Sequence, residues 1–90
     1  MPSYLVETYL ARLKAAERGA LDKRARTAAA ELTHASMRVD FERSIHIPDD
    51  EICFFVFDAP SDGVAVLVAQ RAGLDPIRVV EALSSEQEET

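Results

Sequence analysis

The segment from Glu51 to Ser61 limits the possible folds of this chain more than any other. Its first half is rich in β-branched and aromatic residues and has no breaker before Pro60, so it predicts a strand. Successive residues of a strand point to opposite faces. Both faces are apolar here, with Ile52, Phe54 and Val56 on one and Cys53, Phe55 and Phe57 on the other. A strand that faces water on one side carries polar residues there, so we expect a central strand covered on both sides.

Hydrophobic spacing predicts three further strands and two helices around this segment. The predicted strands cover residues 3–9, 37–47 and 77–83, and the predicted helices cover residues 13–32 and the segment after Ser61. The stripe of the first helix consists of Leu21, Ala25, Ala28 and Leu32. Ser61 is suited to cap the second helix, and Gly73 is suited to end it in a left-handed conformation.

The predicted strand over residues 37–47 alternates as a half-exposed strand does. Its odd-numbered residues form one face (Val39, Phe41, Arg43, Ile45 and Ile47), and its even-numbered residues form the other. Residues 48–50, Pro-Asp-Asp, are typical of a turn, so this strand and the central strand are expected to form a hairpin. If the hairpin pairs Ile47 with Glu51, His46 and Cys53 point to opposite faces.

The element order βαββαβ is that of the ferredoxin-like, or split βαβ, arrangement. It predicts one α+β domain over residues 1–83, with a four-stranded antiparallel sheet, both helices on one face, and the first and third strands in the centre. Residues 84–90 form a polar, acidic segment that we expect to be a disordered tail. The helices leave one apolar face uncovered, so we expect a homodimer or larger homo-oligomer that packs sheet to sheet, as a dimeric α+β barrel does.

Charge and composition exclude several classes of protein. The net charge of −6 argues against a nucleic-acid partner, which requires a basic surface. The single cysteine cannot form an internal disulfide, so no oxidising compartment is implied. No apolar run approaches the ~20 residues of a membrane span, and the N-terminus does not resemble a signal peptide. The expectation is a cytoplasmic domain without a membrane partner.

Polar residues in apolar strands are the first candidate site. Glu7 interrupts the first strand and Glu81 the fourth, and these strands are neighbours in the predicted sheet. If their faces agree, the two carboxylates approach each other and could share a proton, pair with a cation or hold a metal. The predicted ligand-binding residues are Glu7, Tyr9, Arg43 and Glu81. The alternative is that each carboxylate forms an ion pair, with Arg43 or Arg78 as its partner.

Residues near the hairpin turn are the second candidate site. His46, Glu51 and Cys53 offer nitrogen, oxygen and sulfur donors, a set that suits a borderline divalent metal. The alternative is a surface histidine beside a small, buried cysteine with no ligand.

Several segments together resemble one protein family. They are Tyr4–Tyr9, Ile47–Phe54, Phe57–Ser61, Arg71–Leu74 and Val79–Ala82. The chain resembles, over nearly its whole length up to Leu83, a family of small bacterial domains of unknown function that includes a nickel-binding protein of ferredoxin-like fold. The resemblance implies that fold, self-association and a divalent metal such as nickel.

Two kinds of function are consistent with these patterns. The first is a small dimeric binding protein that holds a divalent metal or a small molecule between its sheet and its partner. The alternative is a cofactor-free oxygenase or isomerase of the dimeric α+β barrel class, with Glu7 or Glu81 as general base and Tyr9 as a hydrogen-bond donor. A purely structural dimer, in which the carboxylates only form ion pairs, is the third hypothesis.

Overall fold

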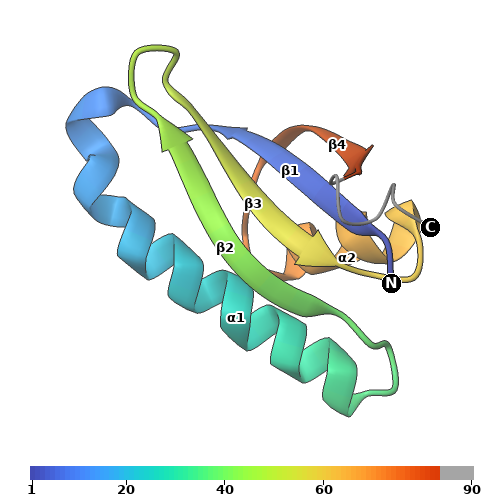
Figure 1. The fold of residues 1–90 in the computed structure, drawn as a ribbon. Coiled ribbons are helices and arrows are strands. Elements are labelled where there is room, and N and C mark those ends of the chain that lie inside the picture. Colours follow the sequence, from blue (N-terminus) through green and yellow to red (C-terminus); the bar gives the residue numbers. More distant parts are fainter. Residues whose placement is uncertain (84–90) are drawn as a thin grey trace.

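The computed structural model of the chain describes residues 1–83 and confirms the ferredoxin-like fold. Its elements are β1 (Ser3–Tyr9), the 3-10 helix η1 (Arg12–Glu17), α1 (Arg18–His34), β2 (Asp40–Ile47), β3 (Ile52–Asp58), α2 (Asp62–Arg71) and β4 (Pro76–Ala82) (Figure 1). The four strands form one antiparallel sheet in the order β2-β3-β1-β4, so β1 and β3 are central as predicted. The predicted acidic tail lies outside the described residues.

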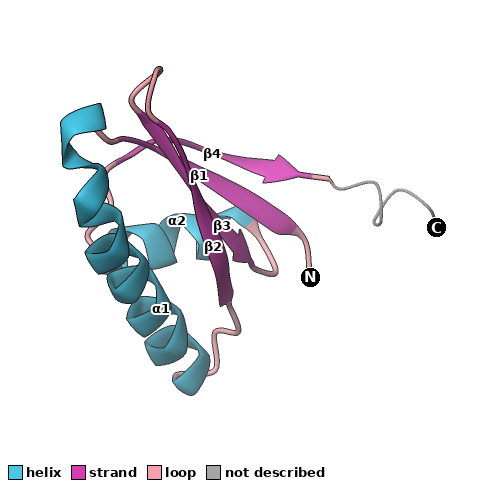
Figure 2. Cartoon of the chain, turned by 60° about the vertical axis from the view of Figure 1, so that its left-hand side comes forward, coloured by secondary structure: helices cyan, strands magenta, loops and turns pink. Residues whose placement is uncertain are grey.

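Both helices pack on one face of the sheet, and within residues 1–83 no element covers the opposite face (Figure 2). We call the uncovered side the open face. The molecule is accordingly flat, with extents of 37 × 32 × 18 Å. The doubly apolar β3 therefore has helices on one side only, and the cover expected on its other side does not come from this part of the chain.

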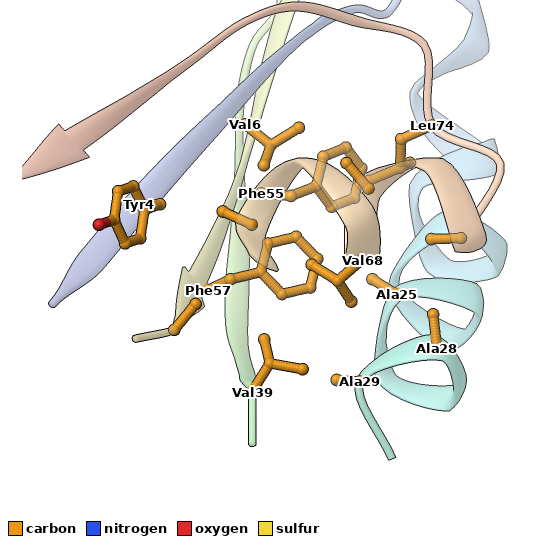
Figure 3. Close-up of a cluster of buried hydrophobic side chains, with 14 of the residues drawn as sticks. Tyr4, Val6, Ala25, Ala28, Ala29, Val39, Phe55, Phe57, Val68 and Leu74 are labelled. Carbon is orange, nitrogen blue, oxygen red and sulfur yellow. The ribbon is translucent and has the colours of Figure 1, made fainter. Parts of the chain in front are cut away.

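The core lies between the sheet and the helices (Figure 3). Phe55 and Phe57 of β3 are fully buried there, against Val6 of β1 and Val68 of α2. The buried stripe of α1 consists largely of alanines, whose small side chains let the helix approach the sheet closely; its members are Ala25, Ala28, Ala29 and Leu32. Three of the four predicted stripe residues are thus buried, and the fourth, Leu21, is partly buried against the core.

The predicted first helix is divided in two. Lys14 has non-helical dihedral angles (φ −108°, ψ 17°), so residues 12–17 form η1 and the α-helix begins only at Arg18. No residue of η1 is buried, and Leu13 is 96% exposed, so packing against the sheet does not hold this segment in an α-helix.

The ends of α2 agree with the sequence. The Ser61 hydroxyl accepts a hydrogen bond from the Val64 amide at 3.3 Å, and Gly73 has φ +74°. The Arg24 side chain of α1 donates to the carbonyl oxygens of Ala72 and Gly73 at 2.8 and 2.7 Å. Carbonyls at a helix end have no partner within the helix, so this guanidinium both caps α2 and joins it to α1.

The prediction that all odd-numbered residues of β2 share one face is wrong. A bulge between Phe41 and Arg43 inserts Glu42 as an extra residue. Phe41 consequently packs on the helix side, with its ring 5.3 Å from that of Phe57, whereas Arg43 lies opposite Val56 on the open face. A one-residue insertion exchanges the faces of every residue after it.

The hairpin register also differs from the one considered above. Ile47 pairs with Ile52, and Glu51 closes the turn with φ 55°. His46 therefore lies directly opposite Cys53, on the helix side of the sheet. In the part of the chain that the structure describes, no helix is long and apolar enough to cross a membrane.

Candidate functional site

The open face carries apolar side chains from all four strands. The strand pairings place these residues there: Leu5, Ile45, Ile47, Ile52, Phe54, Val56, Val80 and Ala82. Ile45 and Ile47 are 41% and 38% exposed, and the central positions Leu5, Ile52 and Phe54 are only half-buried. Water is not a favourable neighbour for a continuous apolar surface of this kind, which marks it as a candidate site.

Glu7 lies on this open face and is held by an arginine. It pairs across the strands with Arg78 of β4, and Arg78 Nε donates to Glu7 Oε1 at 2.7 Å. The Glu7 side chain is 16% exposed and that of Arg78 is 64% exposed. A short, charge-assisted contact of this kind satisfies the carboxylate, which is the ion-pair alternative given above.

Glu81 lies on the other face of the sheet. It pairs with Tyr4, whose side chain points to the helices, so Glu7 and Glu81 are on opposite sides of the β1–β4 pair. The pKa of the Tyr4 hydroxyl is raised by burial, and further by the negative charges of Glu81 and Asp62. The hypothesis that the two carboxylates converge is wrong. Their strands are neighbours, but the observed register places the two side chains on opposite faces of the sheet.

Tyr9 and Arg43 belong to the open face but stand at different borders of it. Tyr9 pairs with Ile52 at the end of β1 and is 63% exposed. Arg43 lies on the edge strand β2, and among residues 1–83 its closest carboxylate is Glu42 at 4.0 Å. Of the four predicted ligand-binding residues, the open face thus contains Glu7, Tyr9 and Arg43 but not Glu81.

The predicted metal ligands are engaged in other bonds. His46 Nε2 is hydrogen-bonded to the carbonyl oxygen of Leu10 at 3.0 Å, and Glu51 Oε2 accepts from the backbone amide of Arg12 at 3.0 Å. Both contacts connect the β2–β3 hairpin to the connection after β1. Each residue thus stabilises the end of the sheet.

Cys53 is fully buried under α1. Burial raises the pKa of its thiol to about 11, with Arg18 opposing the shift and Asp22 adding to it. A metal requires the thiolate, which this environment disfavours. Within residues 1–83 no three His, Cys, Asp or Glu side chains are placed to hold a metal ion. His46, Glu51 and Cys53 as arranged do not fit a nickel site.

Sequence reasoning missed an acidic cluster on the open face. We call Asp40, Glu42 and Asp58 the acidic corner: Asp40 pairs with Asp58, and the bulge places Glu42 beside them. The Ser3 hydroxyl donates to Asp58 Oδ1 at 2.7 Å. The pKa of Glu42 is raised, first by a hydrogen bond shared with Asp58, then by desolvation and by the charges of Asp58 and Asp40, while Arg43 lowers it. The regular alternation of β2 gave no signal for the bulge.

Hollows on the helix side of the molecule are less suited to a ligand. One of about 500 Å³ lies where β1 ends, bordered by Tyr9, Lys14, Glu17 and Asp75 among others. Lys14 and Glu17 already lie within 3.8 Å of each other, and Arg24, also at this hollow, is bound to the end of α2. Lys14, Glu17 and Arg24 thus have structural partners, so this hollow is a weaker candidate site than the open face.

Comparisons with known proteins support the fold. No protein-family model matches the chain, and no curated protein matches it significantly. A solved structure described as the crystal structure analysis of SCO4226 from Streptomyces coelicolor A3(2) is similar, with a TM-score of 0.72. It shares 15% sequence identity, and the match covers 92% of this chain and 99% of that chain. At this identity the likeness shows the fold alone.

Proposed function

We propose that the chain functions as a homodimeric binding protein, in which two open faces meet and enclose a small molecule between them. The observation that carries this proposal is the apolar surface across all four strands, which neither helix covers. Each apolar side chain removed from water stabilises the assembly at ~25 cal/mol per Å². A second copy supplies a matching apolar surface without any further protein.

The dimensions of the molecule leave room for an interface of standard size on its open side. The broad side of the molecule measures 37 by 32 Å. This corresponds to an area on the order of 1,000 Å², and each partner of a standard interface buries about 800 Å². A two-fold interface uses the same patch on both subunits, so the patch must be self-complementary.

The charges of the open face are compatible with self-association. The acidic corner lies at one border, and Arg43 and Arg78 are the cations of this face within residues 1–83. A surface that carries both signs can face its own copy without repulsion everywhere, whereas a purely acidic one could not. A strongly charged partner such as a nucleic acid would meet only part of the surface favourably.

The ligand that suits this face is a small molecule with an apolar body. Binding sites are typically apolar with a few polar groups that fix orientation. Here the Tyr9 hydroxyl and the Arg43 guanidinium are exposed polar groups at the borders, and among residues 1–83 the ion-pair contact of Arg43 is the 4.0 Å one with Glu42. A ligand with a hydrogen-bond acceptor or an anionic group would complement them.

The enzyme hypothesis has less support in the geometry. It required Glu7 or Glu81 as a general base on the site wall. Arg78 donates a hydrogen bond to the Glu7 carboxylate, and Glu81 lies on the helix side of the sheet. Neither is a free base on the open face, so binding is the better supported function.

Sedimentation velocity over a concentration series tests the dimer. The wild type is expected to show a monomer–dimer equilibrium, and Ile45→Asp on the open face is expected to shift it strongly to monomer. Val66→Asp is the matched control, because Val66 is also a partly exposed aliphatic residue (36%, against 41% for Ile45) but lies on α2. A wild-type chain that is monomeric at every concentration would refute the proposal.

Native mass spectrometry of untagged protein tests the ligand. A bound molecule would appear as added mass on the dimer that is lost on denaturation. A dimer of bare mass, with no binder in a small-molecule screen, would favour the purely structural dimer instead.

A further inference from the structure

The acidic corner raises a question for any dimer that uses the open face. Two carboxyl groups that share a hydrogen bond cannot both be charged without repulsion, and the removal of water strengthens that repulsion. In the free protomer Glu42 and Asp58 are still solvated, since the Glu42 side chain is 38% exposed. A partner laid over this face would take most of that water away.

The hydrogen bonds of the corner decide which group holds a proton. Asp58 Oδ1 accepts from the Ser3 hydroxyl, a donor that favours the charged carboxylate. Glu42 stands on the bulge, and within residues 1–83 no hydroxyl donates to it as Ser3 donates to Asp58. Of the two groups, Glu42 is therefore the one whose protonation these surroundings favour, in agreement with the raised pKa of Glu42 beside Asp58.

The other charged groups around Glu42 do not compensate the negative charge of its carboxylate. Asp40 on β2 adds a further negative charge. Arg43 lies 4.0 Å away with its side chain 65% exposed, so its effect is largely screened by water. Arg78 of β4 is engaged with Glu7, β1 contributes only the neutral Ser3, and the reverse side of the sheet presents Phe41 and Phe57.

We infer that self-association of this chain takes up a proton at the Glu42–Asp58 pair of each protomer, so that the dimer tightens as the pH falls. The inference rests on the proposed dimer through the open face. Its sign follows from linkage: if covering the pair makes protonation more favourable, the dimer binds more protons than two free protomers do, and its dissociation constant decreases in acid. Each proton taken up changes that constant by up to about tenfold per pH unit.

The experiment is a set of dimer dissociation constants measured by sedimentation at several values between about pH 5 and pH 8. Wild type is expected to show a fall of more than tenfold, and up to about a hundredfold, per pH unit in the steepest part, because the dimer has two pairs. Glu42→Gln removes the titrating group and keeps the hydrogen bond to Asp58. We expect it to form a tighter dimer than wild type at neutral pH, with a much flatter pH dependence.

Two further variants separate this linkage from the general loss of negative charge in acid. Glu81→Gln makes the same substitution on the other face and is expected to keep the wild-type slope. Asp58→Asn removes the partner of Glu42 and is expected to flatten the slope as Glu42→Gln does. Equal slopes for wild type and Glu42→Gln, in proteins that still dimerise, would overturn the proton linkage and leave the dimer intact. A chain that is monomeric throughout would instead overturn the proposed function and the linkage together.

Discussion

Phe54 and Phe55 are adjacent in β3, identical in type and opposite in situation. Phe55 points to the helices and has no exposed surface, whereas Phe54 points to the open face and is only half-buried. Equally apolar residues thus lie on a face that residues 1–83 cover and on a face that they leave uncovered. The covered face accounts for the fold, and the uncovered face has no role in a single protomer that would require such residues.

The largest expected effect tests this comparison directly. Phe55→Ala removes a fully buried ring and is expected to lower the free energy of unfolding by about 3–5 kcal/mol. That is a large part of the total for a domain of this size. Phe54→Ala should cost clearly less in dilute protein and should instead weaken self-association. Urea unfolding at low concentration, together with sedimentation, measures both quantities.

The comparison fails if the two substitutions destabilise the dilute protein equally. The Phe54 ring would then be as well shielded from water in the single protomer as the Phe55 ring. It would also fail if Phe54→Ala left self-association unchanged while Phe55→Ala, at a temperature where it is folded, abolished it.

A second prediction concerns the Arg24 side chain, which joins the end of α2 to α1 on the helix side of the sheet. Gly73 has φ +74°, and a Cβ there would collide with the Arg24 guanidinium that caps α2. Gly73→Ala is therefore expected to lower stability by about 1–2 kcal/mol, through backbone strain and a displaced Arg24. Thermal unfolding in a buffer that keeps the protein monomeric measures it.

Gly19→Ala is the control for that prediction. A Cβ at Gly19, in the first turn of α1, meets nothing within 4 Å. Alanine is favoured over glycine in helices by up to about 1 kcal/mol, so this variant should be neutral or slightly more stable. Equal losses of stability in both variants would show that the displacement of Arg24 does not cause the effect of Gly73→Ala.

The fold could be predicted from the sequence because each element carries its own signal. β-branched and aromatic residues marked β3, alternation marked β2, Ser61 and Gly73 marked the ends of α2, and the two apolar faces of β3 indicated a central position. These signals are local, and the observed bounds differ from the predicted ones mainly at η1 and at the start of β2.

The candidate site could not be predicted to the same degree because it depends on register. Glu7 and Glu81 were correctly placed on neighbouring strands, but only the observed pairing shows Arg78 opposite Glu7 and Tyr4 opposite Glu81. Both faces of β4 carry apolar residues, so its pattern does not choose between the two parities. The bulge at Glu42 is also invisible, since the apolar positions on either side of it are all odd-numbered.

A third prediction uses the pKa of Cys53 to measure how well the covered face excludes water. The thiol has a pKa of about 11 in the folded protein, above its ordinary value of 9.0. The unfolded thiol ionises first as the pH rises, so stability is lost between these two values. At about pH 10 the expected loss from this group is on the order of 1 kcal/mol.

The measurement is the difference in unfolding free energy between pH 7 and pH 10, compared in wild type and Cys53→Ala. The alanine variant loses some core packing at both values, but its pH-dependent loss should be smaller by about 1 kcal/mol. Tyr4, whose pKa is also raised, contributes equally to both proteins and cancels. A thiol reagent should react with native Cys53 only at the rate of unfolding, and rapid labelling of the folded protein would contradict the prediction.

The smallest expected effect belongs to the Glu7–Arg78 pair on the open face. In the protomer this pair is partly exposed, and such pairs contribute ~0.2–1 kcal/mol. Glu7→Gln should therefore change the stability of the dilute protein by less than 1 kcal/mol. In the dimer the same pair is covered, and Arg78 without its carboxylate becomes a buried, uncompensated cation. Glu7→Gln is accordingly expected to weaken self-association more than it weakens folding, and the double variant Glu7→Gln with Arg78→Gln should recover part of that loss.

Retention of a ligand by wild type and by Glu7→Gln, measured by native mass spectrometry, completes the comparison. If Glu7→Gln abolishes ligand retention while the dissociation constant of the dimer is unchanged, the Glu7 carboxylate contacts the ligand in addition to pairing with Arg78. If stability, association and retention all stay at wild-type values, the pair is solvated in the assembly and the interface does not reach the β1–β4 side of the open face.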